Sequence, residues 1–145
     1  MKYVVSACLL GDNCKYNGGN NYNEKVCKFL NDKKYIKVCP ECLGELGIPR
    51  LPSEIIGDKV VNSSNVDVTL NYKKGAEETL KICQNENINC AIMKSRSPSC
   101  GCGKIYDGTF SKKLVDGDGI TVRLLKKHGI KVLSEEDINE YWLIK

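Results

Sequence analysis

The stretch "KYVVSACLL", residues 2–10, is an apolar run rich in β-branched residues near the start of the chain. Such a run is typical of a strand buried on both faces of a parallel sheet, and we expect the strand to end near Cys8. A basic residue before an apolar run is also found in signal peptides. Here, however, the run is too short and no small-residue cleavage site follows it. The stretch is therefore interpreted as the first strand of a sheet.

Strands and helices alternate along the rest of the chain. Further strands are predicted at residues 35–39, 88–95 and 130–134, and helices at 24–31, 67–87, 117–130 and from Ser134 onward. This order predicts an α/β protein with three α/β/α layers, built on a Rossmann-like, mainly parallel four-stranded sheet. The length suits one domain, residues 1–145. In such sheets, ligands bind beyond the carboxyl ends of the strands.

Local signals define the ends of these elements. Asp67 is the expected N-cap of the long helix, Gly129 the expected C′ residue of the next, and Ser134 with Asp137 a capping box. The long helix is expected to bury one face formed by Leu70, Ala76, Leu80 and Cys83. Residues 40–54 are expected to be an extended loop, and 54–69 a hairpin turning near residues 57–58. We interpret "GDG" (117–119) as a helix-starting turn and "YDG" (106–108) as a β-turn.

The composition argues against several classes of function. The net charge of +4 is spread along the chain, and two Phe and one Trp offer few platforms for stacking bases, so no nucleic-acid partner is expected. No run approaches the ~20 apolar residues of a membrane helix, so no membrane association is expected either. Nine cysteines without a secretory signal indicate a cytoplasmic protein that uses metal, cluster or thiol chemistry instead of disulfides.

The predicted elements divide the cysteines into two groups. Cys27, Cys83 and Cys90 fall inside helices or strands, where a cysteine packs as a small hydrophobic residue. The others follow the ends of three strands and are expected to gather at one end of the sheet: Cys8, Cys14, Cys39, Cys42, Cys100 and Cys102. Three separate strand ends can thus present thiolates to a single point.

Several kinds of thiol site remain open on residue chemistry alone. Zinc prefers paired C-x₂₋₄-C ligands, but "CPEC" (39–42) is the one pair of that spacing, and His128 is expected at a helix end. A thioredoxin-like dithiol needs a helix after "CPEC", which the glycines and prolines of "LGELGIPRLP" disfavour. An iron–sulfur cluster accepts scattered ligands, because each thiolate binds a different iron. A cluster therefore ranks above zinc, and zinc above a dithiol, with little separation.

Five motifs, in this order, cover nearly the whole chain: "SACLLGDNCKYNGG" (6–19), "VCPECLGELGIPRLPSEI" (38–55), "KSRSPSCG" (94–101), "IYDGTFS" (105–111) and "GDGITVRLLKKHGIKVLSEEDI" (117–138). They resemble the thiouracil desulfidase family, iron–sulfur-dependent desulfidases formerly known as a domain of unknown function. The chain departs from the usual pattern at Cys42, where an aliphatic residue is common, and at Cys102, which is extra.

The resemblance implies a 4Fe–4S cluster held by three cysteines, matched here by Cys8, Cys39 and Cys100, with one iron open to the substrate's sulfur. Cys14 is the alternative to Cys8. The family's catalytic acid matches Glu41, and its catalytic serine matches Ser97 in preference to Ser99. The implied reaction is the non-redox desulfuration of a small-molecule thiolated pyrimidine, thiouracil to uracil plus hydrosulfide.

This reaction has a simple chemical basis. A soft thiocarbonyl sulfur binds iron well, its carbon becomes open to water, and a carboxylate can take the proton of that water. Two other hypotheses stay open. One is a non-catalytic iron–sulfur or zinc protein in sulfur or metal handling, and the other is a thiol redox protein that uses Cys39 and Cys42.

Overall fold

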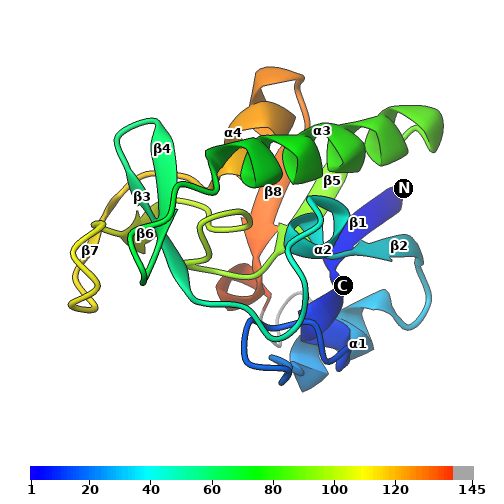
Figure 1. Cartoon of the computed structure of the whole chain (residues 1–145). Coiled ribbons are helices and arrows are strands. Elements are labelled where there is room, and N and C mark those ends of the chain that lie inside the picture. The colour runs from blue at the N-terminus through cyan, green and yellow to red at the C-terminus, as the bar shows by residue number, and fades with distance from the viewer. Residues whose placement is uncertain (139–145) are drawn as a thin grey trace.

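A four-stranded parallel sheet forms the centre of the computed structural model, which describes residues 1–138 (Figure 1). Its strands lie in the order β2 (Lys34–Val38), β1 (Lys2–Ser6), β5 (Cys90–Met93) and β8 (Lys131–Ser134). All three ladders are parallel, which confirms the predicted α/β sheet. From β1 the chain continues to β2 on one side and later to β5 on the other. A topological switch point, where such sheets bind ligands, therefore lies between β1 and β5.

Helices cover both faces of this sheet. On one face, α3 (Thr69–Asn85) and α4 (Ile120–Lys127) pack over Val4, Ala91 and Met93. On the other face, α1 (Glu24–Leu30) and the 3-10 helix η1 (Ala7–Leu10) pack over Val5 and Ile92. Successive strand residues point to opposite faces, so apolar runs such as that of β1 fill two cores at once. Figure 1 shows α3 and α4 on the side of the sheet opposite α1, which confirms the three layers.

Two small antiparallel hairpins extend from the sheet. The hairpin of β3 (Ser53–Ile56) and β4 (Lys59–Asn62) is the predicted one. The hairpin of β6 (Lys104–Tyr106) and β7 (Leu114–Asp116) was not predicted, because β7 is exposed along its length and shows no apolar alternation. Glu54 joins the two hairpins, since its Oε1 accepts hydrogen bonds from the N–H groups of Gly108 (3.0 Å) and Phe110 (3.1 Å).

The prediction that residues 40–54 form an extended loop is wrong at its start. Residues Pro40–Leu43 form the short helix α2, with Cys39 as N-cap and Gly44 as C-cap. Proline favours the first position of a helix because its φ is already helical and its missing N–H needs no partner there. Pro40 therefore begins a helix directly after β2.

Two further expectations about packing are wrong. Leu70 is 80% exposed, and the buried face of α3 consists of Tyr72, Gly75, Ala76, Thr79, Leu80 and Cys83. The helix begins at Thr69, so Leu70 lies in its first turn, off this stripe. Cys27 is partly exposed at the surface of α1, whereas Cys83 and Cys90 are buried as expected.

The predicted helix ends are mostly confirmed. The prediction of Asp67 as the N-cap of α3 is wrong by one residue, since Val68 is the N-cap, but Asp67 accepts a hydrogen bond from the N–H of Thr69 (2.9 Å). Gly129 is the C′ residue of α4, as predicted, with a φ of 79°. Ser134 and Asp137 form the capping box, but it starts the 3-10 helix η2 (Glu135–Asp137). The rest of the predicted last helix lies outside the described residues. Within residues 1–138 no helix is long and apolar enough to span a membrane.

Candidate active site

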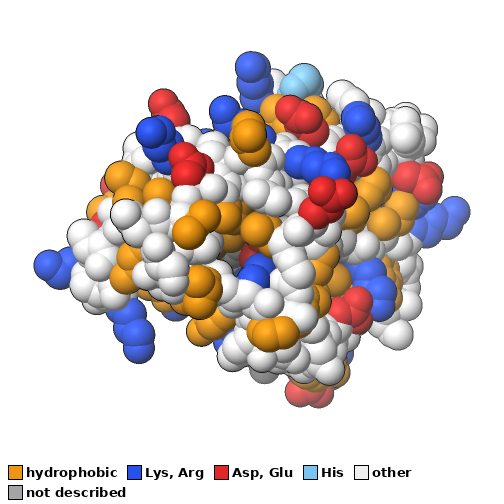
Figure 2. Space-filling view, in the orientation of Figure 1, with side chains coloured by type: hydrophobic (Ala, Val, Ile, Leu, Met, Phe, Trp, Pro, Cys, Tyr) orange, Lys and Arg blue, Asp and Glu red, His pale blue; other side chains and the backbone are white. Residues whose placement is uncertain are grey.

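Loops at the carboxyl ends of three strands surround one cavity of ≈ 470 Å³. Cys8 lies in η1 after β1, Cys39 directly follows β2, and Cys100 lies in the loop after β5. All three line the cavity together with Cys14. Figure 2 shows this face hollowed below α3, with Lys or Arg atoms visible among apolar side chains. The thiols therefore meet at the switch point, as the strand order requires.

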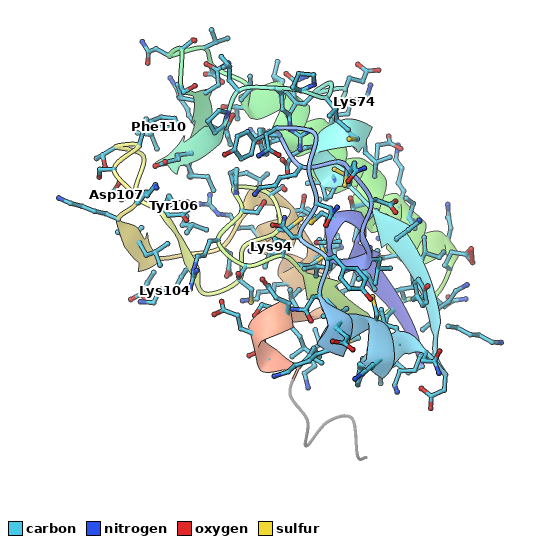
Figure 3. All side chains as sticks on the ribbon, turned by 90° about the horizontal axis from the view of Figure 1, so that it is seen from below. Lys74, Lys94, Lys104, Tyr106, Asp107 and Phe110 are labelled. Carbon is cyan, nitrogen blue, oxygen red and sulfur yellow. The ribbon has the colours of Figure 1, made fainter. Side chains whose placement is uncertain are left out.

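The loop after β5 is fixed to the strand ends on both sides. The N–H of Lys94 donates to Ser6 Oγ at the end of β1 (2.9 Å). Both the N–H and the hydroxyl of Ser95 donate to the carboxylate of Glu135 after β8 (2.7 and 2.9 Å). Lys94, near the middle of the molecule in Figure 3, completes this group through its ion pair with Glu135 (3.1 Å). The loop that carries Cys100 is thus held at its base.

The start of α4 holds the other end of the same loop. The N–H groups of Ile120 and Thr121 donate to the carbonyls of Pro98 (2.8 Å) and Ser99 (3.0 Å). A Cβ on Gly119 would lie 2.5 Å from the Ser99 carbonyl carbon, so a glycine is needed for this approach. These first amides of α4 are bound to the protein's own carbonyls, which supports the interpretation of "GDG" as a helix-starting turn.

A close contact between α2 and α3 positions Cys39 and Glu41. A Cβ on Gly75 of α3 would overlap the carbonyl of Pro40, and a Cβ on Gly44 would overlap the carbonyl of Asn71. The two backbones therefore touch directly, with a glycine on each side. Asn71 also donates a side-chain hydrogen bond to the Gly44 carbonyl (2.9 Å). Helix α2, which carries Glu41, is therefore packed backbone against backbone on α3.

Glu41 is bonded at both carboxylate oxygens. Its Oε2 forms a 2.8 Å ion pair with Arg50, and the two side chains are only 15% and 9% exposed. Its Oε1 accepts a hydrogen bond from the Ser99 hydroxyl and a longer one from the Ser97 hydroxyl (3.5 Å). The carboxylate therefore has little freedom to turn.

Ser97 and Ser99 differ in their access to the cavity. Ser97 lines the cavity, whereas Ser99 is fully buried behind Glu41. The Ser97 oxygen also accepts the N–H groups of Ser99 and Cys100, both at 3.1 Å. Ser97 therefore shapes the turn before Cys100 and offers its hydroxyl to the cavity.

The surroundings of the thiols shift their pKa values in different directions. The Cys14 thiol and the backbone N–H of Cys42 donate hydrogen bonds to Cys39. These bonds outweigh the effect of burial and lower the pKa of Cys39 to about 6. The hydrogen bond to Cys39, together with burial, raises the pKa of Cys14. Burial raises the pKa of Cys100, and it raises that of Cys8 against an opposing hydrogen bond from Asn21. Of these four thiols, Cys39 is thus the readiest thiolate.

Not all of the six cysteines predicted to gather belong to the cavity wall. Cys42 is exposed on α2, and Cys102 contacts the Val132 carbonyl (3.9 Å) in the core beside α4 and β8. The site residues predicted from the family resemblance all line the cavity: Cys8, Cys39, Cys100, Glu41 and Ser97. Within residues 1–138, no three His, Cys, Asp or Glu side chains are close enough to hold one metal ion. The cysteines surround a space instead of converging on a point.

Several residues of the cavity wall were not predicted from the sequence. Arg50 comes from the proline-rich segment after α2, and Tyr72 from the buried face of α3. Tyr106 and Phe110, on the hairpin side of the molecule in Figure 3, line the outer part of the cavity. For Arg50, the one signal in the sequence was its place between two prolines, and this pattern does not predict a binding or catalytic role.

Comparison with known proteins identifies the class of protein that this fold and site define. The 2-thiouracil desulfurase family matches residues 3–137, so the chain belongs to this family of enzymes, and the resemblance of its motifs is confirmed. The uncharacterized protein YbbK of Bacillus subtilis (strain 168) is 44% identical over 147 residues, which cover 94% of this chain and 97% of YbbK. The solved structure of the [4Fe-4S]-dependent thiouracil desulfidase TudS matches with a TM-score of 0.90 and 39% identity, over 99% of this chain and 96% of that one.

Proposed function

We propose that this protein removes sulfur from a thiolated pyrimidine base at a 4Fe–4S cluster held by Cys8, Cys39 and Cys100. The observation that carries the proposal is the cavity at the switch point, lined by these three thiols together with Glu41 and Ser97. Membership of the 2-thiouracil desulfurase family and the likeness to TudS support the same reaction.

The donor set fits such a cluster. Thiolates are the usual ligands of iron–sulfur clusters, and each binds a different iron, so the ligands should surround a space. Three cysteines from three loops satisfy this condition and leave one of four irons without a protein ligand. Cys14 also lines the cavity, but its hydrogen bond to Cys39 supports a role beside the ligands, with Cys8 as the third ligand.

Different residues of the chain would have different roles in the hydrolysis. The bound cluster would supply a Lewis-acidic iron for the soft sulfur of the substrate. Glu41 would take the proton of the attacking water, a contribution of roughly 10²–10⁴-fold in rate. Ser97 would orient that water or the base through its hydroxyl. Oxygen from water replaces sulfur on the ring, and sulfur leaves as hydrosulfide without net oxidation or reduction.

The experiment that tests this function is turnover of 2-thiouracil or 4-thiouracil by the anaerobically reconstituted protein. Uracil and hydrosulfide should form in equal amounts. The Glu41→Gln variant should keep its iron and lose turnover, which separates an enzyme from a protein that only carries a cluster. Reconstituted protein that holds iron but releases no hydrosulfide from either base would contradict the proposal.

A second candidate function is thiol redox chemistry. Its support is that "CPEC" does open a helix, contrary to the expectation from its flanking residues, with Cys39 as N-cap and Cys42 one turn on. Cysteines in this position, with a lowered pKa, are typical of dithiol oxidoreductases. This candidate predicts a Cys39–Cys42 disulfide that exchanges with small thiols in a protein that takes up no iron.

A further inference from the structure

Arg50 is a nearly buried cation that connects three segments around the cavity. Its backbone N–H donates to the carbonyl of Tyr16 (2.7 Å), which joins it to the loop after η1. Its side chain, 9% exposed, reaches Glu41 on α2 and the carbonyl of Cys14. A second guanidinium nitrogen donates to the Gly47 carbonyl (3.3 Å). Hydrogen-bond donors are costly to bury, so a buried guanidinium with this many donors indicates a specific role for the side chain.

The geometry of the guanidinium shows what this task is. Nη2 carries two hydrogens, and it donates to Glu41 Oε2 at 2.8 Å and to the Cys14 carbonyl at 2.9 Å. Both of its hydrogens are therefore used by the protein. The nitrogen closest to Glu41 has no donor left for a substrate, although Arg50 lies in the cavity wall.

Glu41 needs such support because a free side chain would turn among several rotamers. Arg50 holds one oxygen, and the fully buried Ser99 holds the other. A general base is effective only when its oxygen stays within hydrogen-bonding reach of the proton that it takes. Displacement of about 1 Å in such a group can cost 10²-fold in rate.

We propose that Arg50 is a positioning residue that fixes the carboxylate of Glu41 for the desulfuration step. This inference rests on the proposed function, in which Glu41 takes the proton. Arg50 also ties the Cys14 loop to α2, so it holds Glu41 in a fixed place relative to two of the four cavity thiols, Cys14 and Cys39.

The first test is a double-mutant cycle in steady-state kinetics of the reconstituted enzyme. Arg50→Gln should lower kcat about 100-fold with KM changed less than about threefold. In the Glu41→Gln background, Arg50→Gln should cause almost no further loss, because the group it positions is already gone. Multiplied losses, or a raised KM with an unchanged kcat, would mean that Arg50 contacts the substrate and would overturn the inference.

A matched control and a second readout separate this inference from the proposed function. Arg123→Gln removes a partly exposed arginine on α4, outside the cavity, whose Nε donates to the Asp118 carbonyl (2.9 Å), and should keep kcat and iron content. In thermal melting of the full-length protein without iron, Arg50→Gln should lower the melting temperature. Adding Glu41→Gln should then raise it, because an unpaired buried carboxylate is removed.

The melting cycle does not depend on turnover. If the reconstituted wild-type protein does not release hydrosulfide, the proposed function fails, while the melting cycle still decides whether Arg50 fixes Glu41. If Glu41→Gln lowers the melting temperature equally in the wild-type protein and in the Arg50→Gln variant, the two side chains are not coupled, and the positioning role is overturned.

Discussion

Cys39 and Cys42 lie one helical turn apart in "CPEC", but their surroundings differ. Cys39 lines the cavity and accepts hydrogen bonds from Cys14 and from the Cys42 backbone, whereas Cys42 is exposed. Although the residue as a whole is exposed, partial burial of the Cys42 thiol and its hydrogen bond to Cys39 raise its pKa to about 11. Spacing alone could not separate these two thiols, since the difference arises from the direction in which α2 leaves β2.

We expect alanine substitutions at these two cysteines to have opposite effects on cluster binding. Cys39→Ala should lose most of the iron after anaerobic reconstitution, because one of three cluster ligands is removed. Cys42→Ala should bind as much iron as the wild-type protein. Iron content per chain measures both, and equal loss in the two variants would contradict the ligand assignment.

Ser97 combines two tasks in one hydroxyl group. Ser97→Ala leaves the N–H groups of Ser99 and Cys100 without their acceptor, which should cost about 1–3 kcal/mol of unfolding free energy. If the hydroxyl also orients the water or the base, kcat should fall roughly 10²–10³-fold. Denaturant unfolding and steady-state kinetics measure the two effects.

Ser97→Thr is the matched variant, because it keeps the oxygen. It should recover most of the unfolding free energy and part of kcat. A Ser97→Ala variant with wild-type kcat would remove Ser97 from the proposed mechanism and leave it a role in shaping the turn alone.

At the scale of helices and strands, the central sheet was predictable because its two inner strands, β1 and β5, are buried, mainly apolar runs. The hairpin of β6 and β7 and the helix α2 were not, since the first has no alternation and the second starts at a proline. The strand ends also predicted where the cysteines meet. The partners of Glu41 could not be predicted, because Arg50 reaches it through the packing of an irregular segment.

The contact between α2 and α3 predicts that a glycine-to-alanine substitution lowers the unfolding free energy, the opposite of its usual effect in a helix. In an exposed helix interior, Gly→Ala is expected to stabilise by about 1 kcal/mol. At Gly75, a Cβ would overlap the Pro40 carbonyl, so α2 must move away from α3. Gly75→Ala should therefore destabilise the protein by about 1–3 kcal/mol, as overpacking does. Urea unfolding measures the difference.

Lys73→Ala is the control for this change, since Lys73 is an exposed residue of the same helix. Its effect should stay within about 0.5 kcal/mol. If Gly75→Ala raised the unfolding free energy instead, the backbone contact that places Cys39 and Glu41 would be wrong.

At the scale of the whole molecule, the proposed ligands come from three loops that are far apart in the sequence. Cys8 follows β1, Cys39 follows β2 and Cys100 follows β5, so the sheet itself brings the thiols together. A bound cluster would connect these loops in the folded state but not in the unfolded chain. Binding and global stability should therefore be linked.

Loading with iron and sulfide should raise the melting temperature. A ligand at 100 times its Kd stabilises by about 2.7 kcal/mol, which corresponds to roughly 5–10 °C for a chain of this size. Removal of the iron by a chelator should reverse the shift, and Cys39→Ala should show none. Differential scanning calorimetry without oxygen measures it, and a melting temperature that loading does not change would contradict a cluster held by three loops.

The most direct test of the account is the iron and acid-labile sulfide content of protein purified without oxygen, measured together with its visible spectrum. We predict about four irons and four sulfides per chain, with broad absorption from thiolate-to-iron charge transfer. Zinc in place of iron, or no metal after attempted reconstitution, would contradict the account.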